Sequence, residues 1–237
     1  IMKKIILIIT VLISSFSFAQ KVKGNGNVTS ITRTTADYNA ISCSGFMDFE
    51  LIKGTEGAIK IEGEANLLDY IITEVKDNKL IVKTKDRVNL KPSPNKSIKI
   101  TIPFQDIDEV SLSGSGDLWC KDIIITTDLK VSLAGSGDVT LILKTDTLKC
   151  DLTGSGDIKL KGSTNNLEAT LTGSGDLNAS SVTSDYTEVS VTGSGNANVI
   201  SNKYLKARVT GSGDIEYTGN PEKEDTKVAG SGSISKD

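Results

Sequence analysis

The sequence contains no histidine and few aromatic residues: 5% of its 237 residues are aromatic, and Trp119 is the only tryptophan. Without histidine, the chain cannot form a Ser-His-Asp or Cys-His nucleophilic site or an ordinary histidine-ligated zinc or iron centre. Its 27 basic and 30 acidic residues are scattered and give a net charge of -3, so no broad positive surface for nucleic acid is expected. The sequence therefore predicts no catalytic residues, no cofactor and no nucleic-acid partner.

Long apolar stretches are also lacking, apart from one at the N-terminus. Residues 5–13 are apolar, follow Lys3 and Lys4, and precede a small-x-small site that ends at Ala19. This pattern is typical of a secretory signal peptide and is too short to span a membrane; a buried strand or a membrane anchor is the alternative. We therefore expect a signal peptide at residues 1–19 and no membrane span in the mature chain. The protein is expected to be exported to the periplasm, the cell surface or the extracellular space.

Glycine, in contrast, is abundant and follows a pattern. The motif SGSGD at residues 113–117 recurs six more times with small changes, at intervals of 18 to 21 residues. A nearly fixed interval of this length is typical of a solenoid built from stacked repeats. The first glycines of the seven motifs are Gly114, Gly135, Gly154, Gly173, Gly193, Gly211 and Gly230.

Apolar and polar residues alternate on both sides of each motif. In the first copy, Val110 and Leu112 precede the turn, and Leu118 and Cys120 follow it. This period of two predicts two short half-buried strands that meet at a glycine turn. One such unit cannot bury its apolar face alone, whereas copies stacked at ~4.8 Å share a continuous core. The sequence therefore predicts an all-β fold, a parallel β-helix (β-solenoid) with coils of about 19 residues.

The motif residues suit a sharp corner between two strands. Glycine adopts positive φ without a Cβ penalty, and the aspartate can accept hydrogen bonds from nearby backbone amides in an Asx-type turn. Asn196 replaces the aspartate in the fifth copy and keeps an acceptor oxygen. The predicted structural turn residues are Gly114, Asp117, Gly135, Asp138, Gly154, Asp157, Gly173, Asp176, Gly193, Asn196, Gly211 and Asp214.

The stacked aspartates leave a second interpretation open. Unit charges ~5 Å apart repel by about 0.8 kcal/mol in water, and a bound calcium ion could relieve that repulsion, as in nine-residue calcium-binding repeats. Those repeats supply ligands from two turns per coil, whereas this chain has one such turn per coil. The structural turn is therefore the preferred interpretation, and calcium is the alternative, for the column Asp117, Asp138, Asp157, Asp176 and Asp214.

The chain before the repeats keeps the strand rhythm but lacks the glycine motif. Residues 20–30 are rich in glycine and asparagine and are predicted to be a flexible lead-in. Residues 31–110 contain short alternating runs and are interpreted as irregular first coils with a cap, because a solenoid must cover the apolar end of its stack. Residues 111–237 hold the repeat coils, so residues 31–237 are expected to form one β-helix domain.

Four single residues have two interpretations each. Cys43, Cys120 and Cys150 fall on inward strand positions and are interpreted as small core residues, with a disulfide that involves Cys43 as the alternative. Trp119 falls on an outward position and is the candidate ligand contact; alternatively, a return segment or a partner chain covers it.

Several segments resemble a known family, and they occur in the family's order. They are YNAISCSGFMDFELIKG, IKIEGEANLLDYIITEVKDNKLIVKTK, SIKITIP and the SGSGD series. Over essentially the whole chain after the signal peptide, the sequence resembles the putative auto-transporter adhesin, head GIN domain family of exported proteins, common in Bacteroidetes-type bacteria. The resemblance implies a right-handed, single-stranded β-helix and transfers no catalytic residues.

The combined expectation is an exported structural or recognition module, adhesin-like, at the cell envelope. Its flat faces would bind a glycan, an envelope protein or a second copy of itself. A polysaccharide-active lyase or hydrolase on a β-helix scaffold is the alternative. The coil lengths differ by only three residues, which leaves little chain for the long loops that would wall a catalytic cleft.

The signal-peptide interpretation predicts a mature chain that begins at Gln20, because cleavage follows the small residue at the end of the small-x-small site. Mass spectrometry of the protein from its native host measures the N-terminus directly. A chain that retains Met2 would contradict both the cleavage and the predicted export.

Overall fold

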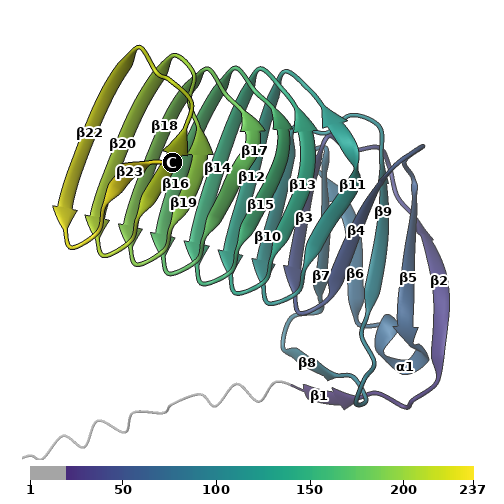
Figure 1. Ribbon diagram of the computed structural model, residues 1–237. Helices are drawn as coiled ribbons and strands as arrows, with labels where there is room; N and C mark the ends of the chain where they lie inside the picture. The colour runs from purple at the N-terminus through teal and green to yellow at the C-terminus, as the bar shows by residue number, and fades with distance from the viewer. Residues whose placement is uncertain (1–19) are drawn as a thin grey trace, which may run out of the picture.

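The computed structural model describes residues 20–237 and consists almost entirely of β-strands, which form a solenoid of about seven turns with coils of about 19 residues (Figure 1). This confirms the predicted fold class. The predicted signal peptide at residues 1–19 lies outside the described residues. The one helix of residues 20–237, α1 (Ala65–Leu68), is a single turn, and no helix there is long and apolar enough to cross a bilayer.

Each repeat coil supplies one strand to each of two parallel sheets. In the ten-stranded sheet, the strands of the repeat coils are β10 (Glu109–Gly114), β12 (Asp128–Gly135), β14 (Thr147–Gly154), β16 (Asn166–Gly173), β18 (Tyr186–Gly193), β20 (Tyr204–Gly211) and β22 (Lys223–Gly230). In the eleven-stranded sheet, they are β11 (Leu118–Ile125), β13 (Val139–Lys144), β15 (Ile158–Ser163), β17 (Leu177–Thr183), β19 (Ala197–Ile200), β21 (Ile215–Thr218) and β23 (Ile234–Lys236).

The inward side chains of successive coils stand in register and fill the space between the two sheets. Leu133, Leu152 and Leu171 are direct partners across neighbouring strands, and each is at most 2% exposed. The next residue after Leu152, Thr153, points outward and is exposed. The alternation of the sequence is therefore the alternation between core and solvent, and burial of these columns is the main stabilising term.

The N-terminal third stacks in an order that differs from the order of the chain. The coil made by β3 (Ala40–Gly45) and β4 (Asp48–Lys53) pairs directly with β10 and β11. The coil made by β7 (Lys79–Thr84) and β9 (Lys99–Phe104) lies on its other side, although it comes later in the chain. Residues 31–110 therefore do not form successive coils; the earlier coil is inserted between two later ones.

Antiparallel strands and α1 cover the apolar end of the stack, as the cap that the sequence required (Figure 1). The strands β2 (Val28–Thr34) and β5 (Ala58–Glu64) extend the eleven-stranded sheet, and β6 (Ile71–Lys76) extends the ten-stranded sheet. A hairpin at Asp77 and Asn78, both with positive φ, joins β6 to β7. In α1, Leu67 and Leu68 are buried against the core.

Residues 20–30, predicted to be a flexible lead-in, instead contain two strand segments, at residues 20–23 and 28–30, joined by residues 24–27. The strand β1 (Gln20–Lys23) pairs in parallel with β8 (Val88–Lys91), and β2 begins at Val28. The Glu64 carboxylate, which is 1% exposed, accepts hydrogen bonds from the Gly26 amide and from the amide and hydroxyl of Ser93. These donors, the Ser93 hydroxyl first, lower the pKa of Glu64. Buried charge that is paired in this way holds the segment in place.

The two glycines of each turn are required for different reasons. Gly154 has φ +127°, and a Cβ on it would lie 2.2 Å from the carbonyl oxygen of Gly135 in the preceding coil. Gly156 has no positive φ, yet a Cβ on it would lie 1.9 Å from the carbonyl oxygen of Gly137. The corners approach so closely that only glycine fits between them.

This steric constraint predicts that Gly156→Ala destabilises the fold by at least about 2 kcal/mol, because the backbone of two coils must move apart. Gly54→Ala is the matched control: Gly54 also lacks a positive φ, and the nearest atom to its added Cβ is 3.9 Å away. The control should change stability by no more than about 0.5 kcal/mol. Denaturant unfolding of both variants measures the difference, and equal effects would contradict the close contact between turns.

Candidate functional site

The turns that connect the two sheets form one continuous edge along the solenoid. At this edge the carbonyl oxygen of Gly135 accepts two hydrogen bonds from the next coil, from the amides of Ser155 (2.8 Å) and Gly156 (3.0 Å). The same pair of bonds recurs from Gly45 through Gly211, at 2.8–2.9 Å and 3.0–3.2 Å. The glycine motif is therefore a junction between coils as much as a turn within one.

The predicted turn aspartates form a ladder along this edge. Oδ1 of Asp138 accepts the amide N–H of Asp157 at 3.0 Å, and Oδ1 of Asp157 accepts that of Asp176 at 3.0 Å. The aspartates accept hydrogen bonds, as the sequence predicts, but the amides that donate to them are not the predicted ones. Each carboxylate reaches the equivalent residue of the next coil and not an amide of its own turn, as an Asx turn would require.

Asn196 fits into the ladder because its amide both donates and accepts. Its backbone N–H and Nδ2 donate to Oδ1 of Asp176 at 2.7 and 3.1 Å, and its Oδ1 accepts the amide of Asp214 at 3.1 Å. Asp214 in turn accepts from the amide and hydroxyl of Ser233. Each position of the ladder therefore requires an oxygen that accepts a hydrogen bond, and no position requires a negatively charged side chain.

The calcium alternative finds no support in this geometry. Among residues 20–237, no three aspartate, glutamate, cysteine or histidine side chains converge so that they could hold a metal ion. One oxygen of each aspartate in the ladder is already bonded to a backbone amide. The arrangement is that of a structural edge.

The sequence analysis missed an additional copy of the turn. Gly45 pairs with Gly114, and Phe49 pairs with Leu118, so the segment SGFMD at residues 44–48 occupies the place of SGSGD. Gly45 has φ +113° and accepts the same two amide bonds from the next coil. The glycine and the aspartate, three residues apart as in every later copy, were the signal that could have revealed it.

A column of buried hydroxyls lines the opposite corner of the solenoid, and the sequence analysis also missed it. Thr145 Oγ1 donates to the carbonyls of Thr127 and Thr147, at 2.7 and 2.9 Å, and Thr164 repeats this arrangement one coil later. The carbonyls of Thr127 and Asp146 also accept backbone amides of the next coil, so the hydroxyls add a side-chain hydrogen bond to a junction that the backbone already makes. The recurrence of serine or threonine at the repeat interval was the available signal, at Thr145, Thr164, Ser184 and Ser201.

Trp119 lies on the outward face of β11 and is half-buried. Its neighbours across the strands are Glu50 and Thr140. The Lys99 ammonium lies 5.6 Å from the centre of the indole ring and forms a 2.7 Å ion pair with Glu50, which lowers the pKa of Glu50. Side chains of the same face therefore flank the ring.

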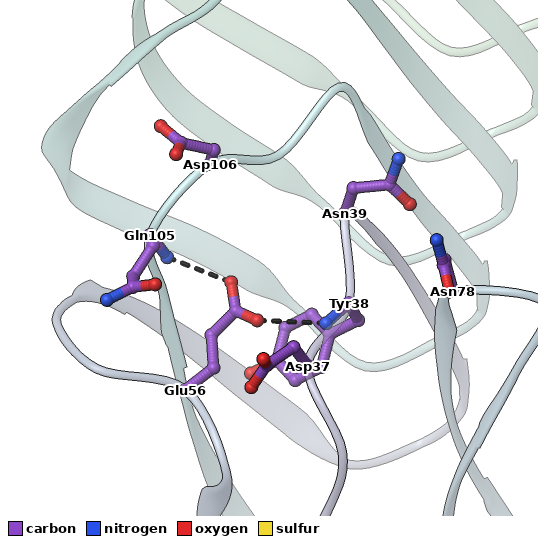
Figure 2. Close-up of a pocket in the computed structure, with 7 residues that line it drawn as sticks. All are labelled: Asp37, Tyr38, Asn39, Glu56, Asn78, Gln105 and Asp106. Atoms are coloured by element: carbon purple, nitrogen blue, oxygen red, sulfur yellow. Dashed lines mark hydrogen bonds between the residues drawn. The ribbon is translucent and has the colours of Figure 1, made fainter.

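Three acidic residues, Asp37, Glu56 and Asp106, line an open hollow of about 280 Å³ beside the N-terminal coils (Figure 2). There the Glu56 carboxylate accepts the backbone amides of Tyr38 (2.9 Å) and Gln105 (3.0 Å), and the Tyr38 hydroxyl donates to the carbonyl of Pro103. Glu56 thus ties three loops together. Its two oxygens are occupied, so the hollow is a structural junction.

The three cysteines are free and buried, in agreement with their interpretation as core residues; no disulfide involves Cys43. Burial raises the pKa of the Cys120 thiol to about 11 and that of Cys150 to about 12, and it also raises the pKa of Cys43. A thiol with a raised pKa stays protonated at neutral pH and is a poor nucleophile.

A comparison with known protein families shows to which family the chain belongs. The family described as putative auto-transporter adhesin, head GIN domain, matches residues 37–221. The chain belongs to this family. The match includes both the inserted coil at β3–β4 and the aspartate ladder, so these features lie within the head GIN domain. Comparison with curated proteins finds no match.

Several solved structures share the fold. A putative adhesin of Bacteroides fragilis has a TM-score of 0.85 at 23% identity, over 91% of this chain and all of that chain. A putative adhesin of Parabacteroides merdae (TM-score 0.74, 26% identity) and a putative lipid binding protein of Parabacteroides distasonis (TM-score 0.72, 27% identity) each cover 92% of this head GIN chain and all of their own. The adhesin-type solenoid is therefore shared along nearly the full length.

The ladder predicts a difference between two substitutions of Asp157. Asp157→Ala leaves the Asp176 amide without its acceptor and should cost about 1 kcal/mol. Asp157→Asn keeps the acceptor oxygen, as Asn196 does, and should change stability by less than half of that. Denaturant unfolding in the presence and absence of a chelator measures both. A fall of the wild-type melting temperature by several degrees in chelator would contradict the structural role and restore the calcium interpretation.

Proposed function

We propose that the protein is an exported recognition module of adhesin type that binds a component of the cell envelope through a flat outward face of its solenoid. The observation that carries this proposal is the family match over residues 37–221. The alternative, a polysaccharide-active enzyme, gains no specific support from the described residues: the ladder aspartates and Glu56 accept backbone amides, and the thiols are buried.

Trp119 is the proposed first contact on that face. An aromatic side chain supplies a large contact area with few rotatable bonds, and this one lies beside the Lys99–Glu50 ion pair. The indole remains partly exposed on the outward face of the eleven-stranded sheet, where an extended partner can reach it without entering a cleft.

Binding to purified envelope fragments, measured by sedimentation, tests the proposal. Wild-type protein should bind, and Trp119→Ala should bind about 10-fold more weakly, since loss of a contact worth ~1.4 kcal/mol gives that factor. Tyr186→Ala is the matched control, because Tyr186 is 47% exposed and also has a lysine ammonium, that of Lys203, 5.9 Å from its ring centre. The control should change binding less than about 2-fold.

Two outcomes would overturn the proposal. If the wild type shows no binding to envelope fragments, the recognition role fails. If new reducing ends or unsaturated sugars accumulate in polysaccharide incubations, and one carboxylate substitution abolishes them, the enzyme alternative takes its place. A lowered melting temperature of Trp119→Ala by many degrees would assign the indole to stability and move the contact elsewhere.

A further inference from the structure

The two sheets present outward faces of different chemistry. On the ten-stranded sheet, basic and acidic side chains of different strands neutralise one another. The ion pairs there are Lys79–Glu109 (2.9 Å), Lys149–Glu168 (3.0 Å), Lys206–Glu188 (2.8 Å) and Arg208–Asp225 (2.5 Å). This face is polar and charge-balanced along its length.

The eleven-stranded sheet lacks this balance over β11, β13 and β15. Lys121, Lys144, Lys159 and Lys161 all lie on the outward side of these strands and are exposed. In residues 20–237, none of the four ammonium groups forms a salt bridge. The exposed acidic residue among them, Asp122, accepts the backbone amide of Lys53 at 2.7 Å. Within these three strands the lysines therefore outnumber the acidic side chains, whereas exposed aspartates (Asp117, Asp138, Asp146 and Asp157) stand at the strand ends.

Large apolar side chains lie among these lysines. Ile52 at the end of β4 and Ile123 and Ile125 on β11 are 38%, 49% and 57% exposed. The register of β11 against β13 is irregular between Trp119 and Ile123, and beyond the irregularity Ile123 stands beside the half-buried Ile142. Three of the seven large apolar side chains that are exposed in the described residues thus gather on these two neighbouring strands.

We propose that the outward side of β4, β11, β13 and β15, here called the isoleucine–lysine face, docks flat on the surface of an anionic lipid bilayer. The proposal rests on the proposed envelope recognition and names its partner. Isoleucine side chains enter the boundary between headgroups and acyl chains, while lysines extend their aliphatic stems and hold their ammonium groups at the phosphates. Trp119 at the margin of this face is a residue type enriched at that boundary.

The mixture of side chains favours a lipid surface over a protein partner. The buried core of a protein interface is depleted of lysine and concentrates its apolar residues in one patch. On the isoleucine–lysine face the lysines stand in the same rows as the isoleucines: Ile142 pairs with Lys161, and Ile125 pairs with Lys144. An anionic membrane tolerates this pattern, because each lysine finds a phosphate and each isoleucine finds an acyl chain.

Vesicle sedimentation with processed protein from an exporting host tests the proposal. We expect binding to equimolar phosphatidylcholine–phosphatidylglycerol vesicles at least 10-fold tighter than to phosphatidylcholine alone, and loss of this difference at high salt. The triple variant Lys144→Gln, Lys159→Gln, Lys161→Gln should bind on the order of 100-fold more weakly, at about 5-fold per lysine. The double variant Ile123→Ser, Ile125→Ser should bind more weakly while its salt dependence persists.

The opposite face supplies the control. The triple variant Lys130→Gln, Lys149→Gln, Lys206→Gln removes the same charge from outward positions of the ten-stranded sheet and should weaken binding less than about 3-fold. Because Trp119 is the only tryptophan, its emission reports the face directly. It should shift to shorter wavelength on the anionic vesicles and be quenched by brominated lipids.

Three results would overturn the inference. Equal losses in the two lysine triples would mean that attraction is diffuse and belongs to no face. If the emission of Trp119 does not change when the protein binds vesicles, the lipid contact lies on another face. Displacement by soluble glycerol phosphate would indicate a headgroup pocket in place of a docking surface. If envelope fragments bind while defined vesicles do not, envelope recognition stands and the partner is a glycan or a protein, so only the lipid assignment fails.

Discussion

From the β3–β4 coil onward, each coil of this solenoid is joined to the next by a backbone contact that only glycine permits. At each of these turns, one carbonyl oxygen accepts two amide hydrogens from the following coil, and a Cβ at either glycine of that following coil would lie about 2 Å from a carbonyl oxygen. The contact fixes how far apart the corners stand and which residue faces which. The apolar columns, the aspartate ladder and the two outward faces all follow from that register, because each is a set of equivalent positions in successive coils.

The repeat region was predictable because its information is local and repeated. A period of two on both sides of a glycine turn, found seven times, is sufficient to predict paired strands and a shared core. The partner of each aspartate was not predictable from the turn alone. Asp138 and Asp157 are 19 residues apart, and an Asx turn, which is the local interpretation of such a motif, uses an amide two residues away.

The cap was harder to predict for the same reason. In the inserted β3–β4 coil next to the cap, the turn at residues 44–48 has Phe46 and Met47 where later copies have serine and glycine. These two residues hid the equivalence of the turn and therefore the insertion of its coil. The position of residues 20–30 depends on Glu64, whose carboxylate accepts the Gly26 amide and lies 38 residues later in the chain. For the candidate contact, alternation placed Trp119 outward correctly, whereas the flanking Lys99 comes from a strand two positions away in the sheet.

Because of the inserted coil, we expect the N-terminal coils of the solenoid to fold slowly and the repeat coils to fold faster. β3 pairs with β7, 39 residues along the chain at Ala40 and Lys79, and with β10, 69 residues along the chain at Gly45 and Gly114. Contacts of such separation form slowly. Each later coil pairs with a neighbour only 18 to 21 residues back and can add to a template that already exists. A chain that emerges from its N-terminus would therefore hold its first half unfinished until β10 and β11 arrive, and then complete the remaining coils one at a time. The β3–β4 coil is thus the surface on which the repeat coils pair one after another.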